Sequence, residues 1–131
     1  MSLNTNAVRK LAADYTAAWN SGDPDRVASF YAENGAIVIN RGDAHQGREA
    51  MAAMAAGFFT AVPDLRLSCD DLRIAGNHAA FFWTFTGHDS ETRNLLSVAG
   101  WEEWDIGNDL KVQSSRGWFD AEDYARQIAG T

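Results

Sequence analysis

Cysteine is nearly missing from this chain of 131 residues, which contains only Cys69, and proline occurs just twice. A lone cysteine cannot form a disulfide within the chain, so we expect a reducing, cytoplasmic location. Long hydrophobic runs are missing too. No segment stays apolar over the ~20 residues that a membrane span needs, and the N-terminal segment lacks the apolar block of a signal peptide. We therefore expect no membrane partner.

Positive charge is also in short supply. The chain has 11 Lys and Arg residues against 18 Asp and Glu, a net charge of −7, and no basic stripe reverses it locally. Nucleic acid is therefore not expected as a partner. The three histidines, His45, His78 and His88, lack the spacing of a metal-binding pair, so the sequence predicts no metal site. We also expect no cofactor.

What remains is the composition of an ordinary globular chain, with 46% hydrophobic and 22% charged residues. The length suits one domain with a real core, and neither repeats nor a linker divide it. We therefore expect a single domain over 1–131.

Helices are predicted first. Apolar residues at steps of three and four indicate a helix from about 4 to 20 with one buried face. The turn at 21–24 ends it and begins a second, short helix, because aspartate can cap and proline fits the first helical position. A third helix is predicted over 48–61, and a closing one after Asp120. The buried stripe of the first helix comprises Val8, Leu11, Ala12, Tyr15 and Trp19.

Strands make up the rest of the pattern. A turn at 33–35 is expected to precede a first strand at 36–40, and a polar loop follows it. From residue 64 onward, alternating residues and short turns predict four antiparallel strands, and a slip in the alternation at 70–71 predicts a β-bulge. The order ααβαββββ plus a C-terminal helix indicates an α+β domain, in which a bent sheet wraps around helices and encloses a cavity.

One glutamate in the segment VAGWEEWDI, residues 98–106, is predicted to share a strand face with apolar side chains. The two-residue period of a strand turns Glu102 to one face and its neighbour Glu103 to the other. The apolar residues that share the face of Glu102 are Val98, Trp104 and Ile106.

A carboxylate in such a place loses hydration, which raises its pKa. Glu102 is therefore a candidate general acid, or a donor to a substrate carbonyl. The alternatives are a structural ion pair with Arg116 or Arg73, or a misjudged strand alternation. Tyr15, on the buried stripe, needs a partner for its hydroxyl, and Glu102 would be one. Tyr15 is equally compatible with a purely structural place in the core.

Three stretches resemble a known family: AAWNSGDPDRVASFYAENGAIVI, Gly47 before the third helix, and KVQSSRGWFD. They are similar to the SnoaL-like domain of the nuclear-transport-factor-two-like superfamily, which includes ketosteroid isomerase, scytalone dehydratase and limonene epoxide hydrolase. The resemblance covers about residues 7 to 120. It implies a cone-shaped, cystatin-like fold, a pocket between the concave sheet and the helices, and a homodimer through the convex face.

The resemblance also assigns positions. Tyr15 and Glu102 match the oxyanion-binding tyrosine and the protonated acid of the isomerase. The isomerase's proton-shuttling aspartate falls on Ile39, and the catalytic aspartate of the SnoaL-type cyclase falls on Gly117; neither residue can move a proton. His45, in the loop that rims the pocket in this family, is the candidate base in their place.

The pocket wall is predicted from the same parity and resemblance. Gln113 shares the parity of the last strand's pocket side. The alternative role of Gly117 is to permit a close strand crossing or a bend. Trp101 and Trp118 project to the opposite, convex side, where an apolar patch is typical of a subunit contact. The predicted ligand-binding residues are Trp104, Ile39, Met54, Phe58, Ser115, Gly117 and Phe119.

Two functions fit these features. The first is a cofactor-free isomerase, cyclase or lyase that moves a proton on a small, apolar, cyclic or polyketide-like molecule, with Glu102, Tyr15 and His45 as its catalytic residues. The second is a non-catalytic ligand-binding or adaptor module of the same fold.

Overall fold

A sheet of six strands, in the order β2-β1-β6-β5-β4-β3, is the framework of the protein in a computed structural model that describes residues 4–131. Four of the five strand pairings are antiparallel, and β1 pairs with β6 in parallel. The strands are β1 (Tyr31–Ile39), β2 (His45–Gln46), β3 (Arg66–Ala75), β4 (His78–His88), β5 (Leu95–Ile106) and β6 (Val112–Phe119). The helices are α1 (Thr5–Ser21), α2 (Pro24–Ala28), α3 (Arg48–Ala61) and α4 (Ala121–Ala129).

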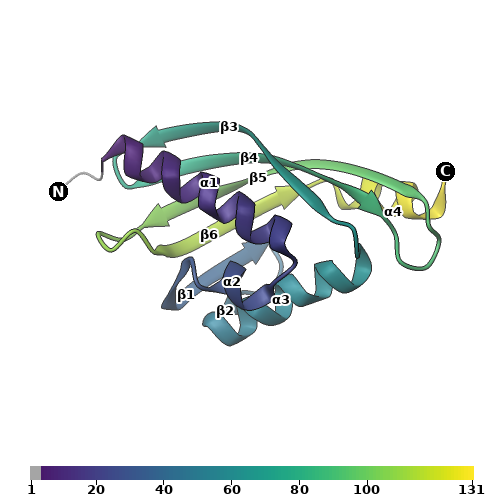
Figure 1. The fold of residues 1–131 in the computed structure, drawn as a ribbon, viewed down its shortest axis with the longest axis horizontal. Coiled ribbons are helices and arrows are strands. Elements are labelled where there is room, and N and C mark those ends of the chain that lie inside the picture. Colours follow the sequence, from purple (N-terminus) through teal and green to yellow (C-terminus); the bar gives the residue numbers. More distant parts are fainter. Residues whose placement is uncertain (1–3) are drawn as a thin grey trace.

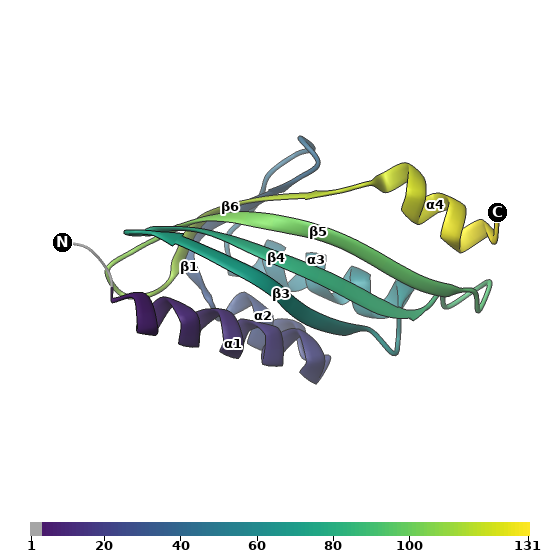
Figure 2. The same ribbon diagram turned by 90° about the horizontal axis from the view of Figure 1, so that it is seen from above.

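The predicted α+β class is confirmed by this arrangement. Figures 1 and 2 show α1, α2 and α3 on one side of the sheet, which curves over them. The last helix, α4, leaves the end of β6 and packs beside the start of β5. There the Asn94 side chain donates to the Ile128 carbonyl at 2.8 Å, and the Ser97 N–H donates to Gln127 at 2.7 Å.

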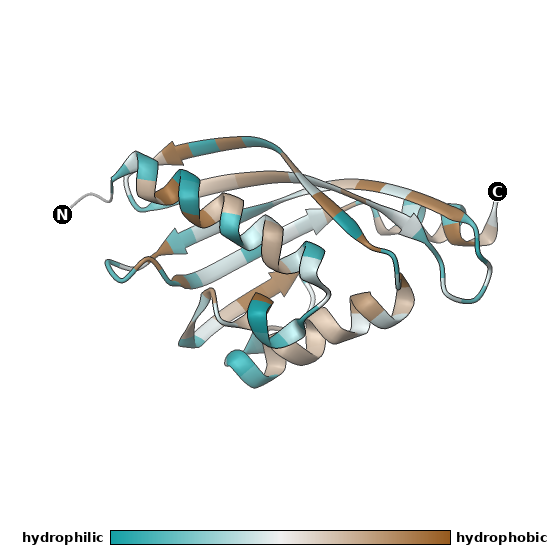
Figure 3. Ribbon diagram, in the orientation of Figure 1, coloured by the Kyte–Doolittle hydropathy of each residue, from teal (hydrophilic) through white to brown (hydrophobic). Residues whose placement is uncertain are grey.

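Local sequence signals explain where the helices begin and end. Asp23 accepts hydrogen bonds from the backbone N–H groups of residues 25 and 26, and Asp120 accepts one from Asp123, as expected of N-caps. Gly22 ends α1 with a φ of 72°, a left-handed conformation that costs glycine little. Along α1, hydrophobic and hydrophilic residues alternate in bands, consistent with one buried face (Figure 3).

The predicted bulge in β3 is also present. The register of β3 against β4 shifts between Cys69 and Asp71, and a tight turn at 76–77 leads into β4. This bulge bends the sheet over α1, which contacts β3 directly.

Two local predictions were wrong. Residues 33–35 form no turn but continue β1, because Gly35 allows a close approach to β6; a Cβ there would lie 2.8 Å from the Val112 carbonyl oxygen. Gln113 does not face the pocket. The β5–β6 register shifts between Asp105 and Ile106, so that Val112 and Ser115 are buried and Gln113 between them is exposed.

The core lies between the concave face of the sheet and the first three helices. Within residues 4–131, no helix has the length and apolarity needed to cross a bilayer. The largest fully buried side chains of the core are Trp104, Tyr15, Tyr31, Phe81, Met51 and Leu96.

Candidate functional site

Glu102 points into the core, as the alternation of β5 predicts. It is 7% exposed, and Trp104 on the same face is 1% exposed, whereas the Glu103 side chain is 47% exposed. On the neighbouring strands Glu102 is paired with Phe81 of β4 and Gly117 of β6. The misjudged alternation considered above is therefore ruled out.

Neither arginine considered as an ion-pair partner reaches Glu102. Arg116 contacts the outward-facing Glu103 and Asp105, each at 3.4 Å, and Arg73 contacts Asp71 at 3.0 Å. The buried carboxyl is held instead by neutral donors.

Four side chains donate hydrogen bonds to the Glu102 carboxyl group. Trp104 Nε1 (3.2 Å), Ser115 Oγ (2.9 Å) and Tyr31 Oη (3.1 Å) donate to Oε1. Tyr15 Oη lies 3.2 Å from both carboxyl oxygens and 3.0 Å from Tyr31 Oη. Three of the four donors thus bind only Oε1, and Oε2 has Tyr15 alone. This asymmetry makes Oε2 the oxygen with capacity for a further partner.

Burial and hydrogen bonding act on the acidity of Glu102 in opposite directions. Burial, the largest cause, raises its pKa above the usual value of 4.5, and the four hydrogen bonds from Trp104, Ser115, Tyr31 and Tyr15 lower it. The net direction is upward. The pKa values of Tyr15 and Tyr31 are raised well above 10.0, first by burial and then by the nearby Glu102 charge. Both phenols therefore keep their protons at neutral pH and act as donors.

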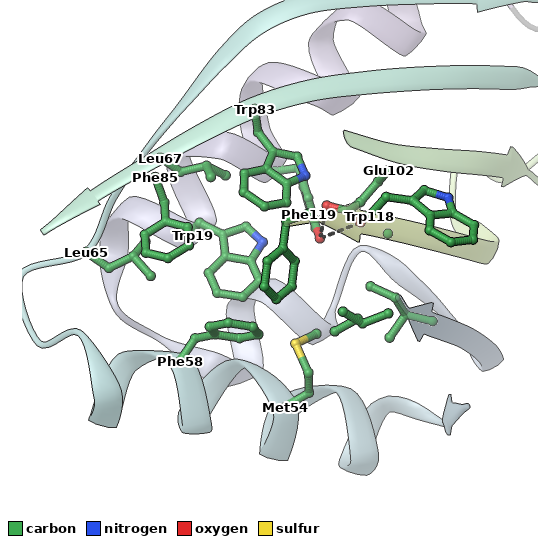
Figure 4. Close-up of a pocket in the computed structure, with 14 residues that line it drawn as sticks. Trp19, Met54, Phe58, Leu65, Leu67, Trp83, Phe85, Glu102, Trp118 and Phe119 are labelled. Atoms are coloured by element: carbon green, nitrogen blue, oxygen red, sulfur yellow. Dashed lines mark hydrogen bonds between the residues drawn. The ribbon is translucent and has the colours of Figure 1, made fainter. Parts of the chain in front are cut away.

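The carboxyl group borders a cavity of about 60 Å³ between the concave sheet and the helices α1 and α3. Figure 4 shows Glu102 on one side of it and aromatic rings from both layers around it. Glu102 is the only charged side chain in the lining among the residues that the structure describes. The lining residues are Tyr15, Trp19, Ile37, Ile39, Met54, Phe58, Leu65, Leu67, Trp83, Phe85, Glu102, Gly117, Trp118 and Phe119.

A model of the SnoaL-like domain family matches residues 12–114. The chain belongs to the SnoaL-like domain family. A comparison with curated protein sequences gives no match. The structural neighbours of this SnoaL-like domain described below are distant in sequence, and they establish its cystatin-like, ketosteroid-isomerase-like fold.

Three of the structural neighbours share 15–19% sequence identity with this chain. A protein with this fold from Catenulispora acidiphila DSM 44928, in complex with trimethylamine, has a TM-score of 0.84 at 16% identity and covers 92% of each chain. A protein from Jannaschia sp. CCS1, provisionally named a SnoaL-like polyketide cyclase, has a TM-score of 0.81 at 15% identity, over 96% of this chain and 91% of its own. An epoxide hydrolase/cyclase-like enzyme of pyran ring formation in salinomycin has a TM-score of 0.78 at 19% identity, over 88% and 92%.

Most of the predicted ligand-binding residues of the SnoaL-like domain do line the cavity. Trp104 and Ser115 are the exceptions, since both are 1% exposed and hold the Glu102 carboxyl group instead. The five that line it are Ile39, Met54, Phe58, Gly117 and Phe119.

The two positions assigned to the family's catalytic aspartates lie side by side. Ile39 of β1 is paired with Gly117 of β6, and Gly117 is paired with Glu102 of β5. The three residues therefore form one row across the sheet, along the cavity. A Cβ on Gly117 would meet Glu102 Cγ at 3.7 Å and Ile39 Cγ1 at 3.9 Å, which are ordinary contacts.

The three histidines lie outside the cavity lining. His45 forms the short strand β2, is half-buried, and is paired with Ile37 of β1. His78 and His88 each bond a carboxylate through Nδ1 at 2.6 Å. None of the three belongs to the lining, so the geometry brings Glu102 and Tyr15 together but not His45. Within residues 4–131, no cluster of His, Cys, Asp or Glu is arranged to hold a metal ion.

Two residues were missed by sequence reasoning. Tyr31 is not among the predicted site residues, yet it begins β1 and donates to a carboxyl group 71 residues away. Trp83 is not among the predicted ligand-binding residues, but it lines the cavity. Its Nε1 is the one buried side-chain polar atom in the described chain without a hydrogen-bond partner. The alternation of β4 gives its direction, but no local signal reveals an unpaired donor.

Proposed function

We propose that this SnoaL-like domain is a cofactor-free enzyme of the isomerase or cyclase type, in which Glu102 is the general acid. The observation that carries the proposal is a single buried carboxyl group, held by four neutral donors, at the edge of an otherwise apolar cavity. A raised pKa keeps a carboxyl group protonated closer to neutral pH, which is what a general acid requires.

The distribution of donors favours Oε2 as the oxygen that transfers the proton. Oε1 is occupied by Trp104, Ser115 and Tyr31, of which the indole N–H can only donate. These three hold the carboxyl group in one orientation. When Glu102 gives up its proton they stabilise the new charge at Oε1, while Oε2, which only Tyr15 contacts, can take a proton back.

Among residues 4–131, the cavity lining contains no base besides the Glu102 carboxylate, which favours reactions in which the substrate supplies its own nucleophile. In such a ring closure Glu102 protonates the oxygen of an epoxide, a hydroxyl oxygen of the same molecule bonds to the epoxide carbon, and the C–O bond at that carbon breaks. The proton of the attacking hydroxyl then passes to the Glu102 carboxylate. Atoms and charge balance, the product is an isomer, and no cofactor is consumed. The cyclase names of two structural neighbours are consistent with this class of reaction.

The size of the cavity points to a compact substrate. A water-sized site needs ~10–15 Å³ by this measure, so about 60 Å³ holds only a few non-hydrogen atoms. To bind a small cyclic ketone or epoxide, the side chains that line the cavity must move apart slightly. To bind a polyketide-like molecule, they must move apart much further.

Glu102→Gln tests the proposal, with turnover of compact hydroxy-epoxides and cyclic ketones followed by mass spectrometry and NMR. The amide keeps the shape and the acceptor oxygen but cannot transfer a proton. We expect turnover to fall by about 100-fold or more and ligand affinity to change little. Equal turnover by the variant and the natural protein would exclude Glu102 as the acid.

A non-catalytic binding module is the second candidate, and one observation favours it. Ile39 and Gly117 stand at the positions that the family resemblance assigns to catalytic aspartates, and neither residue carries a titratable group. Such a module is expected to retain a small molecule and to form no product from any probe; the neighbour in complex with trimethylamine shows that this fold can hold a very small ligand. Mass spectrometry of the protein before and after incubation with a probe separates the two functions.

Because the single Cys69 is an exposed free thiol, we also propose a reducing, cytoplasmic setting.

We further propose a homodimer through the convex face of the sheet. On that face Trp101 is 39% exposed and stacks on Trp118 with ring centroids 6.4 Å apart. Arg41 lies 5.5 Å from the centroid of the Trp118 ring. Exposed aromatic groups of this kind are typical of subunit contacts.

A further inference from the structure

We propose that the indole N–H of Trp83 is a second anchoring point for the ligand, and that the site therefore takes a neutral, compact molecule with a hydrogen-bond-accepting oxygen. This inference rests on the proposed function in one respect, namely that the cavity beside Glu102 is the ligand site.

The first step is the unpaired donor itself. Trp83 Nε1 is buried without a hydrogen-bond partner, whereas the nearby Trp104 Nε1 donates to Glu102. Nearly all buried polar groups in folded proteins are paired, since an unpaired one has lost its hydration and gained nothing. A ligand that supplies an acceptor removes this cost and is selected over one that does not.

The second step is that the ring of Trp83 is fixed in place. Gly100, its partner across the β4–β5 ladder, leaves room for it; a Cβ at Gly100 would lie 2.6 and 2.8 Å from two carbons of the ring. Phe85 stacks against the ring with centroids 6.1 Å apart, and Phe119 packs at 6.3 Å. The indole edge is therefore presented by the scaffold rather than by a mobile side chain.

The third step concerns access. Figure 4 shows the nitrogen of Trp83 on the edge of the ring turned toward the side of the cavity where Glu102 lies, and Phe119 projecting between Trp83 and Met54. The nitrogen is covered by its neighbours, so a ligand reaches it by displacing one of them. In the proposed binding mode the displaced side chain is that of Phe119, which is half-buried, ends β6 and packs against the Trp83 ring. The same movement enlarges the cavity from about 60 Å³ to fit a ring.

The chemistry of the two anchors defines the ligand. An indole N–H only donates, so it selects an oxygen with a free lone pair, as in a ketone, an ether or an epoxide. A hydrocarbon offers no acceptor, and a protonated amine offers none either. When it is protonated, Glu102 is a donor as well, and both polar groups of the site then donate to acceptor atoms of the ligand.

The test compares two probes of nearly equal shape, cyclopentanone and methylenecyclopentane, which differ in a carbonyl oxygen. Dissociation constants are measured by NMR titration for the natural protein, for Trp83→Phe, and for Trp101→Phe as the matched control outside the cavity. We expect Trp83→Phe to weaken binding of the ketone about 5- to 10-fold and to leave the hydrocarbon within about twofold. Trp101→Phe is expected to change neither.

A second measurement does not depend on the folding of any variant. In the natural protein labelled with ¹⁵N at its indoles, the ketone is expected to shift the Trp83 N–H proton resonance downfield, and the hydrocarbon is not. Equal affinities for both probes, or an unmoved Trp83 resonance at saturating ketone, overturn the inference. Turnover is measured separately: loss of turnover in Glu102→Gln with selective ketone binding intact supports both proposals. An inactive natural protein that still binds the ketone through Trp83 refutes only the catalytic one.

Discussion

Replacement of Glu102 by glutamine and by leucine gives opposite expectations for stability. Glutamine preserves the hydrogen bonds of the site. Its amide oxygen accepts from Trp104, Ser115 and Tyr31 as Oε1 does, and its amide N–H donates to Tyr15 Oη, whose own proton then goes to Tyr31 across 3.0 Å. We expect the Glu102→Gln variant to fold with a free energy of unfolding within about 1 kcal/mol of the natural protein near pH 5.

Leucine has a suitable volume but removes the acceptor. Tyr15 and Tyr31 can still bond each other, but Trp104 Nε1 and Ser115 Oγ lose their partner while 1% exposed. Each buried, unpaired donor costs about 1–3 kcal/mol, so Glu102→Leu should lose about 2–6 kcal/mol. This is a large fraction of the roughly 5–15 kcal/mol that stabilises a domain.

Denaturant unfolding at pH 5 and pH 8, followed by tryptophan fluorescence, measures both effects. Because the folded-state pKa of Glu102 is raised above 4.5, folded protein holds this proton more tightly than unfolded protein. The natural protein should therefore lose stability as pH rises from 4.5 through the folded-state pKa, about 1.4 kcal/mol for each pKa unit of that difference. Glu102→Gln lacks this slope. If leucine proves as stable as glutamine, or if the slope is the same in both, the hydrogen-bonded carboxyl group does not contribute as described.

Three further predictions concern single substitutions. Ser115→Ala removes one hydrogen-bond donor from the Glu102 carboxylate, so the acid dissociation constant of Glu102 should fall about tenfold. This is measured by ¹³C NMR of the carboxyl carbon, and an unchanged constant would refute the role of the Ser115 hydroxyl. Gly100→Ala should lower the free energy of unfolding by about 2 kcal/mol or more, because a Cβ there collides with the backbone of the adjacent strand. Gly57→Ala, on an open helix face, should raise it by about 0.5–1 kcal/mol. Thermal unfolding compares the two variants, and equal melting temperatures would contradict the packing described for Gly100. Trp101→Glu should convert the proposed dimer to a monomer in light scattering, and a dimer that persists would place the contact elsewhere.

Features encoded over a few residues could be predicted from the sequence. The caps at Asp23 and Asp120, the bulge at 70–71 and the inward turn of Glu102 each depend on a local pattern of side chains. The two-residue period of a strand is a local property. For this reason the sequence could predict that Glu102 is buried and that its neighbour Glu103 faces outward, away from the site.

Features that depend on distant partners could not. The parallel pairing of β1 with β6 has no signal in either segment, so the strand origin of Tyr31 and its bond to Glu102 were not anticipated. Gly35 resembled a turn residue, although its role is a close approach to another strand. For Ser115 the inward direction was predicted, but its reach to the carboxyl group rather than to a ligand depends on the register of β5 and β6.

The row formed by Ile39, Gly117 and Glu102 makes this protein a convenient host for redesign. Neighbouring strands are about 4.8 Å apart, so position 117 lies one step from the acid and position 39 about 10 Å away. Position 39 already carries the longer side chain of isoleucine, and a Cβ on Gly117 would meet nothing closer than 3.7 Å. A library confined to these two codons would sample one-carboxylate and two-carboxylate chemistry on a single unchanged scaffold, which separates the choice of reaction from the problem of folding.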